Sequence, residues 1–284
     1  MNLNYYPGCT LHGTARDFHE SILAVFEALG VRIVELDDWN CCGASSAHVM
    51  HPEAAWRLPA RNLLIAAGVD RPLLTPCAAC YHRLKLAQYH LQQHPEGHPQ
   101  ARAATAVDVV HVNDMLLKDE LLRRIKERIR APLTGLRVVP YYGCLTVRPP
   151  QAIKHPRPED PVEMDGLLRL LGADVVTWSY KTDCCGGNHA LTRPDLVRML
   201  SGKLFEAARE AGGEVIVTDC PMCQANLDTR QREIEREQRT SFRMPVLYIT
   251  EVLAIAMGLP QTETWWRKHL VDPVPVLKSK GWAA

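Results

Sequence analysis

The chain has 284 residues, 46% of them hydrophobic, which is enough for one large domain or two ordinary ones with a core each. The formal net charge is +1, and no run of lysine and arginine is long enough to follow a phosphate backbone, which argues against nucleic-acid binding. Residues 1–6 lack the basic and apolar regions of a secretory signal, and polar residues interrupt the apolar stretch over residues 246–260. We therefore expect a cytoplasmic protein without a membrane span.

In the first part of the chain, short β-branched or aromatic runs alternate with longer amphipathic segments, a pattern that predicts a small α/β domain. The predicted strands cover residues 3–6, 31–36 and 73–75, and the predicted helices cover residues 14–29 and 53–67. Residues 90–105 then carry prolines, a glycine and histidines without regular ligand spacing, among them His94 and His98. We expect this stretch to be a solvent-exposed linker and the first domain to span residues 1–105.

The second part of the chain repeats this alternation. Its predicted strands cover residues 137–142, 174–178 and 214–218, and its predicted helices cover residues 161–171, 194–211 and 220–237. A proline-rich loop over residues 148–161 could be a lid, a partner contact or a plain surface loop. We expect a second, similar α/β domain over residues 106–258, each domain having a short parallel sheet, and a C-terminal tail over residues 259–284.

All ten cysteines fall into two copies of one pattern, a lone cysteine followed by Cys-Cys-Gly and then by Cys-x-x-Cys. The first copy consists of Cys9, Cys41, Cys42, Cys77 and Cys80, and the second of Cys144, Cys184, Cys185, Cys220 and Cys223. In both copies 34 residues separate the adjacent pair from Cys-x-x-Cys, so the repeat is one of spacing as well as composition. Because the expected compartment is reducing, the pattern favours metal or redox chemistry over structural disulfides.

Each group of cysteines follows a predicted strand and precedes a predicted helix. If the strands of each domain are parallel, the five thiols gather at their carboxyl ends, where open α/β sheets place ligands. Pro221 occupies the first-turn position of the helix after Cys220, so the thiolates of this motif meet the positive end of a helix. The sequence therefore predicts one five-thiol site in each half of the chain.

Three kinds of chemistry compete for sites of this composition. Structural zinc takes four ligands, which leaves one thiol over in each site, and zinc fingers use closer ligand pairs. Dithiol–disulfide exchange uses a Cys-x-x-Cys pair at a helix start but leaves the other three cysteines without a role. Iron–sulfur clusters take thiolate ligands as a rule, although the closely spaced cysteine run of bacterial ferredoxins is absent. The count of five per site favours an unusual iron–sulfur cluster.

The two cysteine copies and their lead-ins, Tyr-Tyr-Pro-Gly-Cys and Tyr-Tyr-Gly-Cys, resemble the tandem cysteine-rich CCG domains in the B subunit of heterodisulfide reductase over about residues 3–230. In that family each CCG motif looks built to bind a noncubane [4Fe-4S] cluster through all five cysteines. The resemblance therefore implies two noncubane [4Fe-4S] clusters as cofactors, one on each group of five. It also implies that a disulfide lies between two facing clusters and takes one electron from each.

The resemblance further implies a catalytic component of an oxidoreductase complex that makes or breaks sulfur–sulfur bonds, with a disulfide or sulfane-sulfur substrate and bacterial sulfur oxidation as the preferred context. Similar chains also accompany succinate, lactate or glycolate oxidoreductases, so a non-catalytic electron-transfer role linked to quinone stays open. The sequence shows no amino-terminal ferredoxin segment and no G-x-G-x-x-G fingerprint for flavin or nicotinamide. We then expect electrons to arrive through partners. By resemblance to heterodisulfide reductase we expect its C-type partner, a ferredoxin-type iron–sulfur subunit, and its A-type partner, a flavin subunit.

Glycines beside the adjacent cysteine pairs are candidate cofactor-binding residues. Gly43 and Gly186 follow the two pairs directly, and Gly187 comes next in the second copy. Without side chains there, backbone N–H groups can approach cluster sulfur. A tight turn alone would also explain these glycines, and the two explanations are compatible.

Four basic residues are candidates for catalytic roles. His48 and His189 lie a few residues past each Cys-Cys-Gly, where they could give a proton to a substrate thiolate. Arg148 and Lys181 flank the second site and could attract an anionic sulfur substrate. The alternatives are structural or surface histidines and solvated surface cations.

Overall fold

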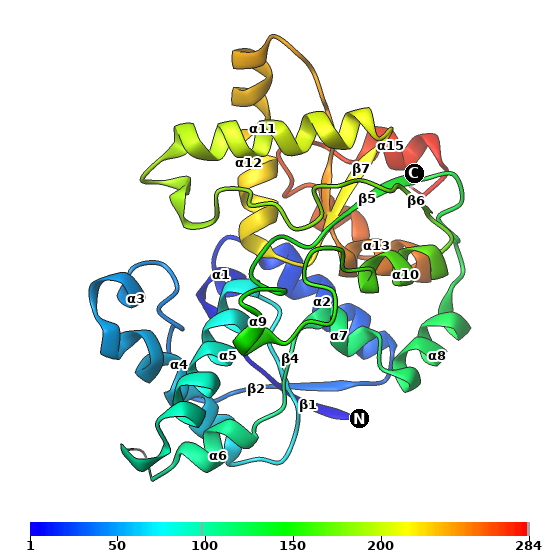
Figure 1. Ribbon diagram of the computed structural model, residues 1–284. Coiled ribbons are helices and arrows are strands. Elements are labelled where there is room, and N and C mark those ends of the chain that lie inside the picture. The colour runs from blue at the N-terminus through cyan, green and yellow to red at the C-terminus, as the bar shows by residue number, and fades with distance from the viewer. Residues whose placement is uncertain (98, 283–284) are drawn as a thin grey trace.

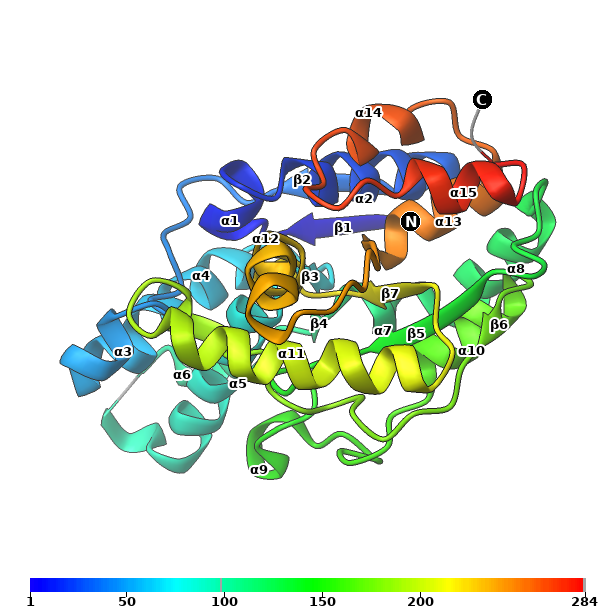
Figure 2. The same ribbon diagram turned by 90° about the horizontal axis from the view of Figure 1, so that it is seen from above.

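The computed structural model describes residues 1–97 and 99–282 and contains two four-stranded parallel sheets (Figures 1 and 2). The strands lie in the order β2-β1-β3-β4 in the first sheet and β6-β5-β7-β8 in the second. Every strand pair is parallel. The two halves therefore share one topology, which confirms the predicted α/β fold class with two repeated domains.

The first sheet is built from the amino-terminal part of the chain. Its strands are β1 (Asn2–Tyr5), β2 (Arg32–Glu35), β3 (Leu73–Leu74) and β4 (Val109–Val110). Its helices are α1 (Gly8–His12), α2 (Arg16–Ala28), α3 (Ala47–Met50), α4 (Pro52–Ala67), α5 (Ala78–Gln93), α6 (Ala101–Ala106), α7 (Val112–Leu116) and α8 (Asp119–Arg128). The three strands and two helices predicted here occur with ends at most two residues from the expected positions.

The second sheet follows the same plan. Its strands are β5 (Arg137–Tyr141), β6 (Asp174–Val175), β7 (Val215–Thr218) and β8 (Val246–Tyr248). Its helices are α9 (Pro150–Ile153), α10 (Glu163–Leu170), α11 (Pro194–Glu210), α12 (Pro221–Gln238), α13 (Ile249–Met257), α14 (Thr262–Trp266) and α15 (Val274–Ser279). β6 is shorter than predicted because the chain leaves the sheet after Val176, whose N–H still donates to the Val138 carbonyl at 2.9 Å. Beyond it, Trp178 donates a side-chain hydrogen bond to the Pro140 carbonyl at 2.8 Å.

Each sheet has a fourth strand that the sequence pattern does not predict, because β4 and β8 are too short to show a period. In each half, a glutamine on the helix that follows Cys-x-x-Cys forms a hydrogen bond to the segment that leads into this fourth strand. Gln88 Nε2 donates to the Val107 carbonyl at 2.8 Å, and Gln231 Nε2 donates to the Met244 carbonyl at 2.8 Å. Since β4 pairs with β3, the first sheet extends past residue 105, where we expected the first domain to end.

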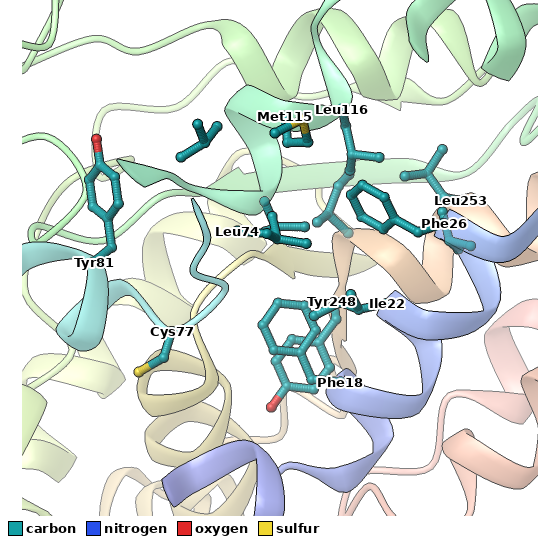
Figure 3. Packing of buried hydrophobic residues seen from close by; sticks show 14 of the residues in the cluster. Phe18, Ile22, Phe26, Leu74, Cys77, Tyr81, Met115, Leu116, Tyr248 and Leu253 are labelled. Atoms are coloured by element: carbon teal, nitrogen blue, oxygen red, sulfur yellow. The ribbon is translucent and has the colours of Figure 1, made fainter. Parts of the chain in front are cut away.

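A shared apolar core joins the two halves. Phe18 and Phe26 on α2 are fully buried, and the Phe18 ring stacks on Tyr248 with centroids 4.1 Å apart and an interplanar angle of 7° (Figure 3). The hydroxyl groups of Ser21 and Thr250 form a hydrogen bond of 2.6 Å beside this stack. Full burial of one large apolar side chain stabilises a fold by about 1.5–3 kcal/mol, so this contact between α2 and the second sheet holds the halves together.

The stretch over residues 90–105 is not the linker that we predicted. α5 continues through His90 to Gln93, and α6 packs against α4 and α5. The His90 ring stacks on Trp56 with centroids 4.8 Å apart, whereas His94 is exposed as expected. His98 lies outside the described residues. The prolines and glycine mark one turn, and the alanine-rich α6 after it carries too little apolar periodicity to be recognised.

The proline-rich loop over residues 148–161, which we call the insertion, and the tail both cover the core. α9, inside the insertion, packs against α5 of the first half (Figure 1). In the tail, α14 contacts α2 and α13 and buries Trp265 and Trp266 (Figure 2). Among the described residues, every helix is too short or too polar to cross a bilayer.

Candidate metal centre

In each half the five cysteines gather at the carboxyl ends of the parallel strands, as the spacing predicts. In the first half, Cys9 lies in α1 after β1, Cys41 and Cys42 follow β2, and Cys77 and Cys80 lie at the start of α5 after β3. The second group occupies the same places after β5, β6 and β7. All ten thiols are free. The chain therefore brings each five-thiol group together without disulfide bonds.

Within each group the sulfur atoms are neighbours. Cys9 Sγ lies 3.9 Å from Cys41 Sγ, and Cys42 Sγ lies 3.3 Å from Cys80 Sγ. In the second group the pair equivalent to Cys42 and Cys80 is 3.7 Å apart. A disulfide requires about 2.05 Å between sulfurs, so these contacts are those of thiols that converge on one site.

A tyrosine three residues before each lone cysteine organises both sites in the same way. The Tyr6 hydroxyl donates to the Asn40 carbonyl at 2.8 Å, and the Tyr141 hydroxyl donates to the Asp183 carbonyl at 2.7 Å. Each carbonyl belongs to the residue just before the adjacent cysteine pair. Burial, and then the negative charge of nearby thiolates, raises the pKa of both phenols, so both remain donors at neutral pH.

The glycine before each lone cysteine leaves room for sulfur. Gly8 and Gly143 have φ angles of +69° and +66°, which favour glycine. A Cβ would lie 2.8 Å from Cys80 Sγ at Gly8 and 2.9 Å from Cys223 Sγ at Gly143, closer than real Cβ contacts. Five converging thiols and a backbone without side chains at the point of contact fit a compact inorganic cluster with thiolate ligands.

The glycines after the adjacent pairs direct backbone N–H groups at sulfur. The Gly43 N–H donates to Cys41 Sγ at 3.5 Å, and the Gly186 N–H donates to Cys184 Sγ at 3.3 Å. The N–H of Gly187 likewise bonds to a thiol, that of Cys185. This is the geometry expected of cofactor-binding glycines, and contact with a cofactor itself stays a prediction.

These surroundings make several thiols acidic. Hydrogen bonds from Cys42 and Cys9 lower the pKa of the Cys41 thiol to about 2, and a hydrogen bond from Cys144 lowers the pKa of Cys184 to about 6. A hydrogen bond from Cys80 lowers the pKa of Cys77 to about 7 against the opposing effect of burial. Thiolate is the form in which cysteine binds metal, so these three thiols are prepared for ligation near neutral pH. Hydrogen bonds and burial instead raise the pKa of the thiols of Cys9, Cys42, Cys80, Cys144 and Cys223.

The loops and helices that carry the two five-thiol groups lie beside each other, and we call the two groups together the paired centre. Asn188 Nδ2, in the loop after the second cysteine pair, donates to the Ala44 carbonyl, in the loop after the first pair, at 2.6 Å. Ala78, between the cysteines of the first Cys-x-x-Cys, lines the same cavity as all five cysteines of the second group. α5 and α12, which begin at the two Cys-x-x-Cys motifs, are in contact.

The two histidines predicted as proton donors lie beside the paired centre. His48 is half-buried, with Nδ1 3.2 Å from the Gly43 carbonyl oxygen. His189 is exposed and is close enough to Cys184 to add to the effect of the Cys144 hydrogen bond in lowering the Cys184 pKa. Each histidine thus stays near the cysteine pair that precedes it in sequence, and its role as a proton donor stays a prediction.

Arg148 and Lys181 have carboxylate partners of their own. Lys181 is buried, and its Nζ lies 2.9 Å from Asp165 Oδ1 and 2.8 Å from Asp160 Oδ1. Arg148 Nη2 lies 2.5 Å from Glu159 Oε2. The carboxylates neutralise both cations, which here hold the insertion against the segment before the second cysteine pair. Lys181 is therefore neither a solvated charge nor free to attract an anion.

Sequence reasoning missed six residues that shape the sites. They are Tyr6, Gly8, Arg83, Tyr141, Gly143 and Asn226. A signal existed for the tyrosines and the glycines, because each recurs at the same distance from an equivalent cysteine, whereas Arg83 and Asn226 differ in residue type and carry no such signal. The tyrosines and glycines are part of the aromatic lead-ins, and the other two lie three residues after the last cysteine of each copy.

Comparison with known proteins agrees with this geometry. The family model for the cysteine-rich domain named CCG matches residues 3–85 and 138–228, and each matched segment contains one complete group of five cysteines. A solved structure of a hypothetical protein from Helicobacter pylori has the same fold, with a TM-score of 0.70 and 10% identity. That match covers 95% of this chain and 52% of the other, so this chain spans about half of that protein.

Three curated relatives match over most of their length. One is the 8-methylmenaquinol:fumarate reductase membrane anchor subunit of Wolinella succinogenes, 27% identical over 94% of this chain and 96% of that protein. Another, from Archaeoglobus profundus, is named as like the B subunit of heterodisulfide reductase and is 28% identical over 89% of both chains. A third is the B subunit of the ferredoxin/F(420)H(2)-dependent CoB-CoM heterodisulfide reductase of Methanosarcina acetivorans, 26% identical over 97% of this chain and 95% of that protein.

Proposed function

The chain belongs to the cysteine-rich CCG domain family and has relatives named after the B subunit of heterodisulfide reductase, and from that premise we propose that it makes or breaks sulfur–sulfur bonds as the catalytic iron–sulfur component of a complex. The observation that carries the proposal is the paired centre. The hydrogen bond from Asn188 to Ala44 joins the loops that follow the cysteine pairs of the two complete five-thiol groups. Ala78 of the first group's Cys-x-x-Cys lines the cavity of the second group. A sulfur–sulfur bond has two atoms to be captured, and a centre with two adjacent sites suits that substrate.

We propose one noncubane [4Fe-4S] cluster on each group of five cysteines. Thiolates are the usual ligands of iron–sulfur clusters, and five in one site exceed the four that structural zinc takes. The positions of Gly8 and Gly143 support this choice, because any side chain there would meet a ligand sulfur.

When bound, the two clusters would supply one electron each, so that a disulfide takes up two electrons and two protons and becomes two thiols. The chain's own residues set the direction of approach. Cys9, Cys41 and Cys184 are exposed, whereas the Cys-x-x-Cys thiols are buried, so substrate comes from the side of the lone and paired cysteines. His48 and His189 lie on this side, each after one cysteine pair, and in this proposal each gives one proton to a departing thiolate.

A second candidate function is electron transfer without catalysis, in a quinone-linked complex. The relative from Wolinella succinogenes favours it, because that protein is named as part of an 8-methylmenaquinol:fumarate reductase and matches 94% of this chain. In this function the paired centre relays electrons, and neither site needs to admit a sulfur substrate.

Relatives named as subunits of reductases support a place in a larger complex. As partners we propose a ferredoxin-type iron–sulfur protein and a flavoprotein. We propose the cytoplasm as the location, because free thiols persist in a reducing compartment. Bacterial sulfur oxidation stays our predicted context.

Anaerobic purification followed by iron analysis and electron paramagnetic resonance tests the proposal. We expect about eight irons per chain, since each cluster holds four. Titration with thiols and disulfides should then change the signal of the oxidised clusters. Four irons or none contradict the two-cluster claim. Full iron with a signal that no thiol or disulfide perturbs, together with a co-purifying quinone-linked partner, favours the electron-transfer function instead.

A further inference from the structure

Arg83 and Asn226 occupy equivalent places in the two sites. Each lies three residues after the last cysteine of its Cys-x-x-Cys, on α5 and α12 respectively. Both are buried, with 8% and 4% of their surface exposed. Asn226 Nδ2 lies 3.4 Å from Cys185 Sγ and also donates to the Gly187 carbonyl at 3.1 Å. The second site therefore has a neutral amide at this place, and the first site has a guanidinium.

The Arg83 guanidinium is a buried cation without a carboxylate. Its Nη2 donates to the Ala55 carbonyl at 2.5 Å. Its Nε is buried and has no hydrogen-bond partner in the described part of the chain, where Arg83 also forms no ion pair. Burial lowers the pKa of Arg83, and the negative charge of Cys42 opposes that effect. Because arginine stays protonated in proteins, a buried guanidinium requires a nearby anion.

The cysteine group of the first site is the candidate for that anion, because cysteine binds metal as thiolate. Cys42 lies in the middle of the first group, with its Sγ 3.3 Å from Cys80 Sγ. Cys80 is on the same helix as Arg83, one turn earlier, so α5 holds both the guanidinium and the Cys80 sulfur. A fixed positive charge next to an iron–sulfur centre stabilises its reduced form, because reduction adds negative charge.

We propose that Arg83 makes the two sites electrically unequal and gives the first site the higher reduction potential. The inference rests on the proposed binding of one cluster by each site. Asn226 supplies the second site with a neutral dipole only, so one electron added to the pair resides on the first site. Arg83 acts here as a positioning residue, because its positive charge compensates the negative charge of the thiolates that would hold the cluster.

The test is an anaerobic redox titration of the full chain, followed by electron paramagnetic resonance and absorption, with iron content measured in parallel. Arg83→Gln removes the charge at similar length. The oxidised-to-reduced ratio of one cluster at a fixed potential should rise at least tenfold. This corresponds to a midpoint potential lower by about 59 mV for one electron. The other midpoint should stay in place. Arg83→Lys keeps the charge and should keep both midpoints close to those of the unaltered protein.

Asn226→Lys provides the reverse test and does not depend on the folding of an Arg83 variant. A cation at this place should raise the midpoint that Arg83→Gln leaves unmoved. Loss of half the iron in Arg83→Gln but not in Arg83→Lys also supports the proposal, since it shows that the site needs the charge.

Three results would overturn the inference. The first is full iron in Arg83→Gln with both midpoints unchanged, which leaves the proposed function standing. The second is an equal effect of Arg83→Lys and Arg83→Gln on midpoints or iron, which assigns the effect to packing. The third is the absence of iron from the unaltered protein, which overturns the proposed function as well.

Discussion

The first and second five-thiol sites share a backbone frame and differ in the charge placed beside it. In each, a tyrosine hydroxyl binds the carbonyl before the cysteine pair, and a glycine with positive φ precedes the lone cysteine. Beside these common features the first site has Arg83 and the second has Asn226. In both sites hydrogen bonds to the backbone hold the segments that carry the cysteines, whereas the side chain three residues after the last cysteine is a cation in one site and an amide in the other.

Access to the two sites also differs. Cys9 and Cys41 of the first site are exposed, whereas Cys144 of the second is half-buried. The insertion that follows Cys144 carries α9, which packs against α5 of the first half. The insertion thus ties the segment that follows Cys144 to the first half.

The largest expected effect separates the two sites by removing one ligand from each. Cys42→Ser and Cys185→Ser replace equivalent buried cysteines, so each variant should lose one cluster and retain about four of about eight irons. Iron and sulfide analysis after anaerobic purification measures this. Loss of all iron from either variant would show that the sites do not assemble independently, and full iron in both would exclude these cysteines as ligands.

A pH dependence of stability should arise where the tail meets both halves, because His269 of the tail contacts Glu251 on α13 and Asp17 on α2. His269 Nδ1 lies 3.3 Å from Gln224 Nε2, and its Nε2 lies 2.9 Å from Glu251 Oε1 and 3.6 Å from Asp17 Oδ2. The residue equivalent to Gln224 in the first half is Tyr81. Burial opposes the His269 cation, but the charges of Glu251 and Asp17 outweigh it and raise the His269 pKa to about 9.

A raised histidine pKa stabilises the fold fully below the ordinary value of about 6.5, and the stabilisation is lost as pH rises through about 9. The loss should amount to about 3 kcal/mol in the free energy of unfolding. Denaturant unfolding of the reduced protein between pH 6 and pH 10 measures it, with His269→Gln as the comparison. The same slope in both proteins would remove His269 as its source.

Glycine variants test the frame that both sites share. Gly143→Ala should destabilise the fold by about 2 kcal/mol, from the strain of φ +66° and the contact with Cys223 Sγ. Gly135→Ala is the matched control, because Gly135 has φ +82° but a Cβ added there would meet nothing within 4 Å. Thermal unfolding of both variants separates contact from strain. Equal losses would mean that the space beside Cys223 is not required.

The smallest effect should be the same in both sites. Tyr6→Phe and Tyr141→Phe each remove one buried hydrogen bond, to Asn40 and Asp183, and should each cost about 1 kcal/mol of stability. Denaturant unfolding measures both, with Tyr180→Phe as an exposed control. A large difference between the two variants would break the equivalence of the frames.

Much of the fold follows from the sequence, because the predicted strands alternate with long amphipathic helices. The positions of the thiols also follow, since each cysteine group comes directly after a strand and parallel strands end at one edge. β4 and β8 could not be predicted, because their position depends on hydrogen bonds from Gln88 and Gln231 that form only in the folded chain.

The surroundings of the site were harder to predict than its ligands. Arg148 and Lys181 read as free cations in sequence, but the fold brings Glu159 and Asp165 to them. Arg83 belongs to no motif, and only its burial with an unpaired Nε, found in the described part of the chain, marks it out. Such partners come from different elements, so only tertiary packing reveals which charges remain uncompensated.

The central claim is that the two five-thiol sites form one paired centre, and electron paramagnetic resonance of the iron-loaded protein tests it most directly. Spectra of the unaltered chain should be compared with those of Cys42→Ser and Cys185→Ser, in a state in which both sites are paramagnetic. Because the loops after the two cysteine pairs are joined through Asn188 and Ala44, we expect a magnetic interaction in the unaltered protein that neither variant shows. A spectrum of the unaltered protein that equals the sum of the two variant spectra would contradict the paired centre.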